Sequence, residues 1–185
     1  MRIVAGRHRG RVLLAPPGAT TRPTADRVRE ALFNILAHGE TPPLRGARVL
    51  DAFAGSGALG FEALSRGAAH ATFMEIDPAA YAVIHGNARK MTAEGEADIL
   101  RADATRPPPA RRPCDIVLMD PPYKSGLGQT ALTALAAQGW IAPQALVVVE
   151  VAAAEAFASP LPDFVIADER RYGAARLVFL RPAAP

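Results

Sequence analysis

The alternation of short apolar runs with helical segments constrains the fold of this chain more than any other feature. From Ala47 onward, the expected strands are Arg48–Asp51, Ala71–Glu75, Ala97–Arg101, Ile116–Asp120 and Ala145–Val151, with helices at Ala58–Arg66, Pro78–Met91 and Gly128–Gln138. The segments Phe164–Arg171 and Ala174–Leu180 are typical of a closing hairpin around Tyr172-Gly173. Strands joined through helices pair in parallel by right-handed crossovers. The sequence therefore predicts an α/β fold with a doubly wound, mostly parallel sheet.

Composition excludes several classes of protein. Half of the 185 residues are hydrophobic and 21% are charged, as in a soluble folded domain. A membrane helix needs about 20 consecutive apolar residues, and we find no stretch of that length. We also find no secretory signal at the start. The single cysteine, Cys114, excludes a disulfide framework, and the histidines are too scattered for a metal site. We expect a cytoplasmic monomer without a metal.

Positive charge gathers at the N-terminus. Residues 1–30 hold seven arginines against two acids, whereas the whole chain has a net charge of only +3. We expect a basic hairpin with strands Arg2–Ala5 and Arg11–Leu14, then a helix from Thr24 and a linker over Gly39–Pro43. Such a basic extension favours an anionic partner. The candidate RNA contacts are Arg7, His8, Arg9 and Arg11 in the hairpin, and Arg22, Arg27 and Arg29 around the helix, off its apolar stripe. Residues 1–43 would form this extension, and residues 44–185 the α/β domain.

A glycine-rich loop follows the first strand of the α/β domain. The segment Gly55-Ser56-Gly57-Ala58-Leu59-Gly60 matches G-x-G-x-x-G between a strand and a helix, where a doubly wound sheet binds its cofactor. The pattern alone admits a dinucleotide or S-adenosylmethionine. Asp51 favours the second, because a carboxylate there would repel a pyrophosphate and attract the α-amino group of a methionine.

Two further acids suit an adenosine. Glu75, at the end of the second strand, would meet the ribose, and Asp103, after the third, would meet the adenine. Asp77 is the alternative to Glu75 but is better explained as a helix cap. The candidate cofactor residues are therefore Asp51, Phe53, Gly55, Ser56, Gly57, Glu75 and Asp103.

The most specific motif ends the fourth strand. Asp120-Pro121-Pro122-Tyr123 offers a carboxylate and carbonyl oxygens, while the two prolines lack backbone donors. An acceptor-only site fits an exocyclic amine on a base, since that amine has two hydrogens to donate. Accepting both would favour a pyramidal nitrogen with its lone pair aimed at a methyl group. Tyr123 would stack on the base after the base has left its helix. We take these four residues as the candidate catalytic set.

Together these blocks resemble a known family. Asp51-Ala-Phe-Ala-Gly-Ser-Gly resembles the first motif of class I methyltransferases, and Asp120-Pro-Pro-Tyr resembles the motif of amino-methyltransferases. With Arg2-Ile-Val-Ala-Gly and Arg22-Pro-Thr-x-Asp-Arg-Val-Arg-Glu, they resemble the bacterial RsmD family of 16S rRNA guanine-N2 methyltransferases over nearly the whole chain. The resemblance implies a Rossmann-like seven-stranded sheet with an N-terminal β-hairpin, S-adenosylmethionine as cofactor, and 16S rRNA within the small ribosomal subunit as partner. Where Tyr123 stands, the family often has Phe.

Other functions fit parts of the pattern. A DNA or RNA adenine-N6 methyltransferase would use the same amine-binding motif, and the residues themselves do not separate it from a guanine-N2 enzyme. A protein-glutamine methyltransferase would leave the basic arm without a use. A dinucleotide-binding protein would use only the glycine loop, and a plain RNA-binding module would use neither cleft motif. The resemblance alone selects guanine N2.

Overall fold

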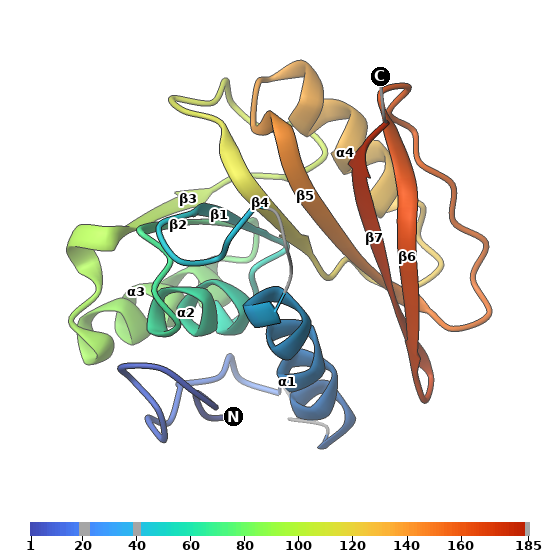
Figure 1. Cartoon of the computed structure of the whole chain (residues 1–185). Helices are drawn as coiled ribbons and strands as arrows, with labels where there is room; N and C mark the ends of the chain where they lie inside the picture. The colour runs from blue at the N-terminus through green and yellow to red at the C-terminus, as the bar shows by residue number, and fades with distance from the viewer. Residues whose placement is uncertain (19–22, 39–41, 184–185) are drawn as a thin grey trace.

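A seven-stranded sheet forms the centre of the computed structural model, which describes residues 1–18, 23–38 and 42–183 (Figure 1). Its strand order is β3-β2-β1-β4-β5-β7-β6. The pairs from β3 to β5 are parallel, and β7 lies antiparallel between β5 and β6. The expected α/β fold, its mostly parallel sheet and its closing hairpin are confirmed. The order of the strands reverses between β1 and β4, the position at which such sheets bind ligands.

The elements follow the apolar pattern of the sequence closely. The strands are β1 (Arg48–Ala52), β2 (His70–Glu75), β3 (Ala97–Arg101), β4 (Cys114–Met119), β5 (Ile141–Ala152), β6 (Phe164–Tyr172) and β7 (Ala175–Pro182). The helices are α1 (Pro23–His38), α2 (Ala58–Ser65), α3 (Pro78–Met91) and α4 (Leu127–Ala137), with a 3-10 turn, η1, at Glu94–Glu96. Among these elements β5 differs most from expectation, because it begins four residues early. No helix within the described ranges is long and apolar enough to cross a membrane.

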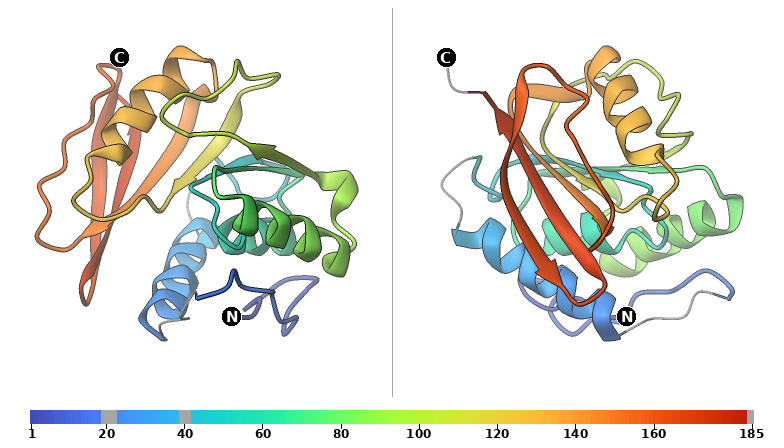
Figure 2. Two further views of the ribbon diagram at one scale, coloured as in Figure 1. Left: turned by 180° about the vertical axis from the view of Figure 1, so that it is seen from behind. Right: turned by 90° about the vertical axis from the view of Figure 1, so that its right-hand side faces the viewer.

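Helices cover both faces of the sheet. On one face lie α1, α2 and α3, and on the other lies α4 (Figures 1 and 2). Side chains alternate between the faces along each strand. In β1, Val49 belongs to the core under α1–α3, and its neighbour Leu50 belongs to the core under α4. This double burial explains why the central strands are almost continuously apolar.

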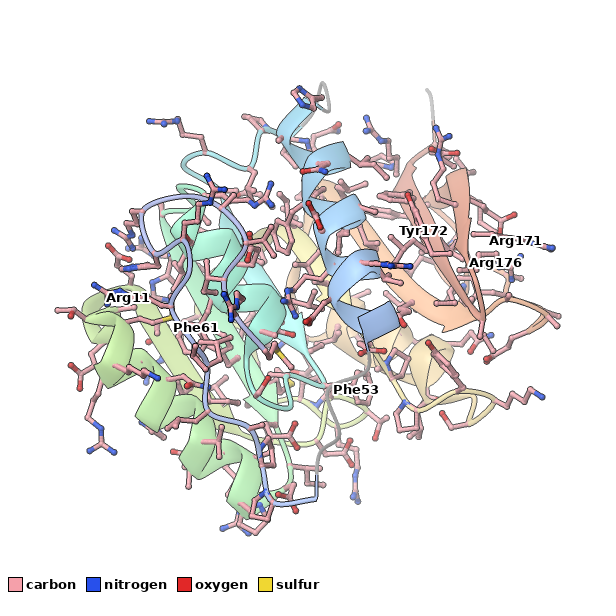
Figure 3. The ribbon with its side chains drawn as sticks, turned by 90° about the horizontal axis from the view of Figure 1, so that it is seen from below. Arg11, Phe53, Phe61, Arg171, Tyr172 and Arg176 are labelled. Atoms are coloured by element: carbon pink, nitrogen blue, oxygen red, sulfur yellow. The ribbon has the colours of Figure 1, made fainter. Side chains whose placement is uncertain are left out.

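The first 18 residues, here called the N-terminal arm, cross the outer side of α2 and α3 (Figure 3). The expected hairpin strands are reduced to one antiparallel bridge between Arg2 and Val12. The reason is that α2 competes for the backbone of the arm. Buried Glu62 accepts hydrogen bonds from the backbone nitrogens of Val4 and Ala5, at 2.8 and 3.1 Å. These donors are therefore not available for a regular β ladder.

Further contacts hold the arm at both of its ends. Gly6 has φ +83°, and a Cβ atom there would lie 1.8 Å from the carbonyl oxygen of Ser65, so only glycine fits this close crossing. The backbone of Leu14 donates to Asn87 Oδ1 at 2.7 Å, and Asn87 Nδ2 donates back to the Leu14 carbonyl at 3.1 Å. Nδ2 also donates to the carbonyl oxygen of Ser56 in the glycine loop, at 2.9 Å.

The basic residues of the arm and of α1 differ in their surroundings. Arg9 and Arg27 are exposed as expected, Arg7 forms an ion pair with Glu96, and Arg11 donates to the Lys90 carbonyl at 2.9 Å. As candidate RNA contacts, His8 and Arg29 are also expected to be exposed, and the structure shows that they are not. The His8 side chain is buried, because the arm folds down onto Ser65, and Arg29 on α1 is only 5% exposed. Arg22 and residues 39–41 of the expected linker lie outside the described residues.

Candidate active site

The glycine loop joins β1 to α2 at the reversal point of the sheet. Phe53 has φ +63°, an uncommon conformation for a residue other than glycine, and Gly55 has φ +57°. A Cβ atom on Gly55 would meet nothing within 4 Å, so this side of the loop is open. The turn therefore shapes a recess, and Figure 3 shows Phe53 beside the first turn of α1.

Asp51 lies beneath this loop. It is 1% exposed, and its Oδ2 accepts a hydrogen bond from the backbone nitrogen of Gly60 at 2.8 Å. Burial raises the pKa of Asp51 well above its ordinary value, and the nearby charges of Asp120 and Glu75 add to the rise. A buried carboxylate with one hydrogen bond favours a cationic partner.

Glu75 holds the loop from the end of β2. Its Oε2 accepts from the backbone nitrogen of Gly55 at 2.7 Å, and its Oε1 accepts from that of Asp77 at 2.8 Å. Each oxygen keeps a second lone pair that could meet a ribose hydroxyl. Asp77 accepts from the backbone nitrogen of Ala80 at 2.8 Å and so caps α3, as its sequence position indicates.

Asp103 lies in the loop that follows β3. Its Oδ1 accepts from the backbone nitrogen and the hydroxyl of Thr105, at 2.8 and 2.7 Å. These bonds, with a smaller contribution from Arg106, lower the pKa of Asp103. The side chain is thus a fixed anion near the rim of the site.

Asp120 directly follows β4, beside Glu150 of β5. Parallel pairing sets Met119 opposite Val149, so Asp120 and Glu150 occupy the next matching positions. Solvent reaches Asp120, yet the walls of the site and the charge of Glu150 raise its pKa to about 7. The Tyr123 hydroxyl donates to Glu150 Oε1 at 2.6 Å. The motif therefore presents paired carboxylates to the site.

Two adjoining pockets contain these residues. The first, of about 300 Å³, lies between α1, the glycine loop and β4, and it includes Asp51, Gly55 and Ser56. The second, of about 740 Å³, is lined by Glu75, Asp103 and the residues from Asp120 to Tyr123. Four residues line both pockets: Val28, Phe53, Asp120 and Glu150. Asp120 therefore lies where the two pockets meet.

All but one of the expected cofactor and catalytic residues line one or both pockets, the exception being Gly57. Sequence reasoning missed Glu150, whose only signal is one acid within an apolar strand. It named Arg29 as an RNA contact but did not expect it to line the first pocket from α1. Arg7, His8, Arg9 and Arg11 line neither of these pockets. In the part of the chain that the structure describes, no cluster of three His, Cys, Asp or Glu side chains could hold a metal ion.

The acidic side chains of the site fit S-adenosylmethionine better than a dinucleotide. Asp51 would meet an ammonium group beneath the loop, and Glu75 and Asp103 would meet an adenosine in the wider pocket. Exposed Ile76 adds apolar surface to that pocket, as a base requires. A pyrophosphate would face acids at every one of these positions. A dinucleotide therefore fits the pocket poorly.

The fold and this arrangement of acids define a Rossmann-like methyltransferase. A family model described as Conserved hypothetical protein 95 matches residues 1–181, and the chain belongs to that family, the RsmD family. Ribosomal RNA small subunit methyltransferase D of Escherichia coli K12 is 44% identical over 151 residues, which cover 81% of this chain and 74% of that protein. Its namesake from Haemophilus influenzae is 38% identical, covering 81% and 78% of the two chains.

Solved structures show the same fold. The Escherichia coli protein yhhF superposes with a TM-score of 0.82 at 36% identity, covering 100% of this chain and 99% of that chain. RsmC of Thermus thermophilus, a 16S rRNA N2 methyltransferase of guanine 1207 solved with AdoMet and guanosine, gives a TM-score of 0.71 at 20% identity. It covers 90% of this chain and 45% of that chain, and at this identity it supports the fold alone.

Proposed function

We propose that this protein transfers a methyl group from S-adenosylmethionine to the exocyclic N2 amine of a guanine in 16S rRNA of the small ribosomal subunit. The target nucleotide would be guanine 966. The observation that carries the proposal is the position of Asp120 at the junction of the two acid-lined pockets that would hold the two halves of the cofactor. The names of the relatives support ribosomal RNA as the substrate.

The cofactor would lie across the carboxyl ends of β1 to β4. Asp51 would hold the α-amino group, Glu75 the ribose hydroxyls and Asp103 the adenine edge, with Phe53, Gly55, Ser56 and Gly57 forming the turn around it. When bound, S-adenosylmethionine supplies a methyl group on a positively charged sulfur. The surrounding carboxylates would favour binding of that positive charge in a site partly shielded from water.

The motif at the end of β4 would prepare the amine. Asp120 would accept a hydrogen bond from one N2 hydrogen, and the Pro121 carbonyl would accept one from the other. The nitrogen lone pair would then point at the methyl group. As the carbon–nitrogen bond forms and the bond from that carbon to sulfur breaks, the positive charge passes to N2. N2 must then lose a proton, and the raised pKa of Asp120 suits that carboxylate to receive it. Pro122 keeps the turn rigid, and Tyr123 would pack against the base.

Residues 1–43 would serve as an RNA-binding extension of a catalytic domain formed by residues 44–185. Exposed Arg9 and Arg27 are the strongest candidates for phosphate contacts, and Arg22 belongs with them by sequence. Arg7 and Arg11 would have to exchange their present partners for phosphates. His8 would support the arm from within, because its ring is buried.

The proposal is tested by incubating the protein with labelled S-adenosylmethionine and small subunits from a strain that lacks the methylation. We expect label in N2-methylguanine of 16S rRNA. Label in N6-methyladenine, or in duplex DNA, would favour the adenine enzyme instead. Absence of label from every nucleic acid would refute the proposal.

Methyl transfer should depend on pH through the carboxylates at the end of β4. The folded pKa of Asp120 is raised to about 7, so its acceptor form is depleted below that pH. We therefore expect kcat/KM to rise about tenfold per pH unit below pH 6 and to level off above pH 8. This acid limb of the pH profile reflects the coupled titration of Asp120 and Glu150, not of Asp120 alone. Calorimetry of cofactor binding at each pH is the control, and a flat profile would contradict the role of Asp120.

Asp51→Asn should stabilise the free protein and weaken cofactor binding. Because burial raises the folded pKa of Asp51 above its unfolded value, the ionised form costs stability at pH 8, and that cost vanishes at low pH. We expect the Tm of the variant to rise by about 2–4 °C at pH 8, and by less at pH 5. Its affinity for S-adenosylmethionine should fall about 10- to 100-fold, through loss of a charged hydrogen bond. Scanning calorimetry and titration calorimetry measure the two effects, and unchanged affinity would remove Asp51 from the cofactor site.

A further inference from the structure

Glu150 is an acid of both pockets to which the proposed mechanism gives no contact with the substrate. It stands on β5 beside Asp120, because Met119 and Val149 are paired in the preceding register position. Neighbouring strands lie about 4.8 Å apart, so the two carboxylates come from adjacent points of the sheet edge and face the same side. Both line both pockets. A ligand that reaches Asp120 therefore also reaches Glu150.

Tyr123 fixes the direction of this second carboxylate. The Tyr123 hydroxyl donates to Glu150 Oε1 at 2.6 Å, which gives that hydroxyl a function that stacking alone does not require. Burial of Glu150 raises its pKa, and the bond from Tyr123 opposes the rise. Asp120, Tyr123 and Glu150 thus form one acceptor surface with two carboxylates at its centre.

Two adjacent carboxylates distinguish guanine from adenine. The Watson–Crick edge of guanine carries neighbouring donors, N1–H and the N2 amine, whereas adenine places the lone pair of N1 beside its N6 amine. A carboxylate facing N1–H gains a charge-assisted hydrogen bond. The same carboxylate facing the adenine N1 lone pair meets another acceptor, which costs binding energy.

We propose that Glu150 is a specificity-determining residue that accepts the N1–H of the target guanine while Asp120 accepts from its N2 amine. The inference rests on the proposed function, and it assigns the choice between guanine N2 and adenine N6 to one side chain. Tyr123 acts as a positioning residue for Glu150. The paired acids at the ends of β4 and β5 would thus recognise a base that presents two adjacent hydrogen-bond donors, N1–H and the N2 amine.

The test compares guanine with 2-aminopurine at the target position of 16S rRNA assembled into small subunits. 2-Aminopurine keeps the amine at C2 but has no hydrogen on N1. We expect the wild-type protein to prefer guanine by about 100-fold or more in kcat/KM, as sites built around a hydrogen bond do. In Glu150→Gln the amide can donate to the bare N1, so the preference should fall below about tenfold. Tyr123→Phe should reduce the preference by a smaller factor.

The outcomes distinguish failure of the role proposed for Glu150 from failure of the proposed function. Equal rates on both bases by the wild-type protein would overturn the role of Glu150 and leave guanine methylation intact. Because 2-aminopurine also lacks O6, an unchanged preference in Glu150→Gln would overturn it too. Absence of transfer to guanine would instead refute the proposed function. Asp163→Asn, the loss of an exposed acid between β5 and β6, is the matched control, and cofactor calorimetry reports whether each variant is folded.

Discussion

Asp120→Ala is expected to reduce methyl transfer by about 1000-fold while leaving the affinity for S-adenosylmethionine within about threefold of that of the wild-type protein. Removing one preorganised polar group from a site of charge development costs about 100- to 1000-fold. Here the same change also removes the acceptor for the departing proton. The affinity should persist because Asp51, Glu75 and Asp103 come from other strands. Single-turnover transfer to small subunits and titration calorimetry measure the two quantities.

Two further variants help to interpret this result: the conservative replacement Asp120→Asn and the control Asp163→Ala. The amide of Asn keeps one acceptor oxygen, so Asp120→Asn should retain more activity than Asp120→Ala. The acid limb of its pH profile should move to lower pH, because Glu150 then titrates without a charged neighbour. Asp163 is an exposed acid between β5 and β6, and its replacement should change neither measurement. If Asp120→Ala loses cofactor affinity instead of transfer, Asp120 belongs to the cofactor site.

Glu62→Ala is expected to lower the free energy of unfolding by about 3 kcal/mol and to release the N-terminal arm. Glu62 is fully buried on α2, where it accepts from the backbone of Val4 and Ala5 and forms an ion pair with Arg66 at 2.7 Å. Alanine leaves two backbone donors and a largely buried guanidinium without their acceptor. Chemical denaturation measures the loss, and protease cleavage within residues 1–18 reports the release.

The control for this change is Glu30→Ala, the loss of an exposed acid from α1, which should stay within about 0.5 kcal/mol of the wild-type protein. Glu62→Gln keeps an acceptor oxygen and should give an intermediate value. An arm that remains protected in Glu62→Ala would show that Ser65 and Asn87 suffice to hold it.

The central sheet could be predicted because its signals are local. Strands buried on both faces are apolar runs, and their parallel carboxyl ends bring Asp51, Glu75 and Asp120 to one edge whatever the surrounding packing. The roles of these side chains remain proposals, since position alone assigns none. The resemblance of the four sequence blocks gave the family, which the comparisons confirm.

The errors arose where a side chain depends on a distant segment. The arm was expected to pair with itself, but Glu62, far along the chain, takes its backbone donors. Arg29 lies beside residues of the apolar stripe of α1, and only the packing of that helix over the first pocket reveals its burial. Glu150 looks like any acid near the end of a strand until β5 is set beside β4.

Asn87 links two segments that the sequence keeps far apart. Its amide group bonds to Leu14 in the arm and to the Ser56 carbonyl of the glycine loop at the same time. Truncating this one side chain would therefore free the last anchored residue of the arm and remove a support behind the turn at the cofactor pocket. We therefore expect contact with RNA and contact with the cofactor to weaken together in such a variant.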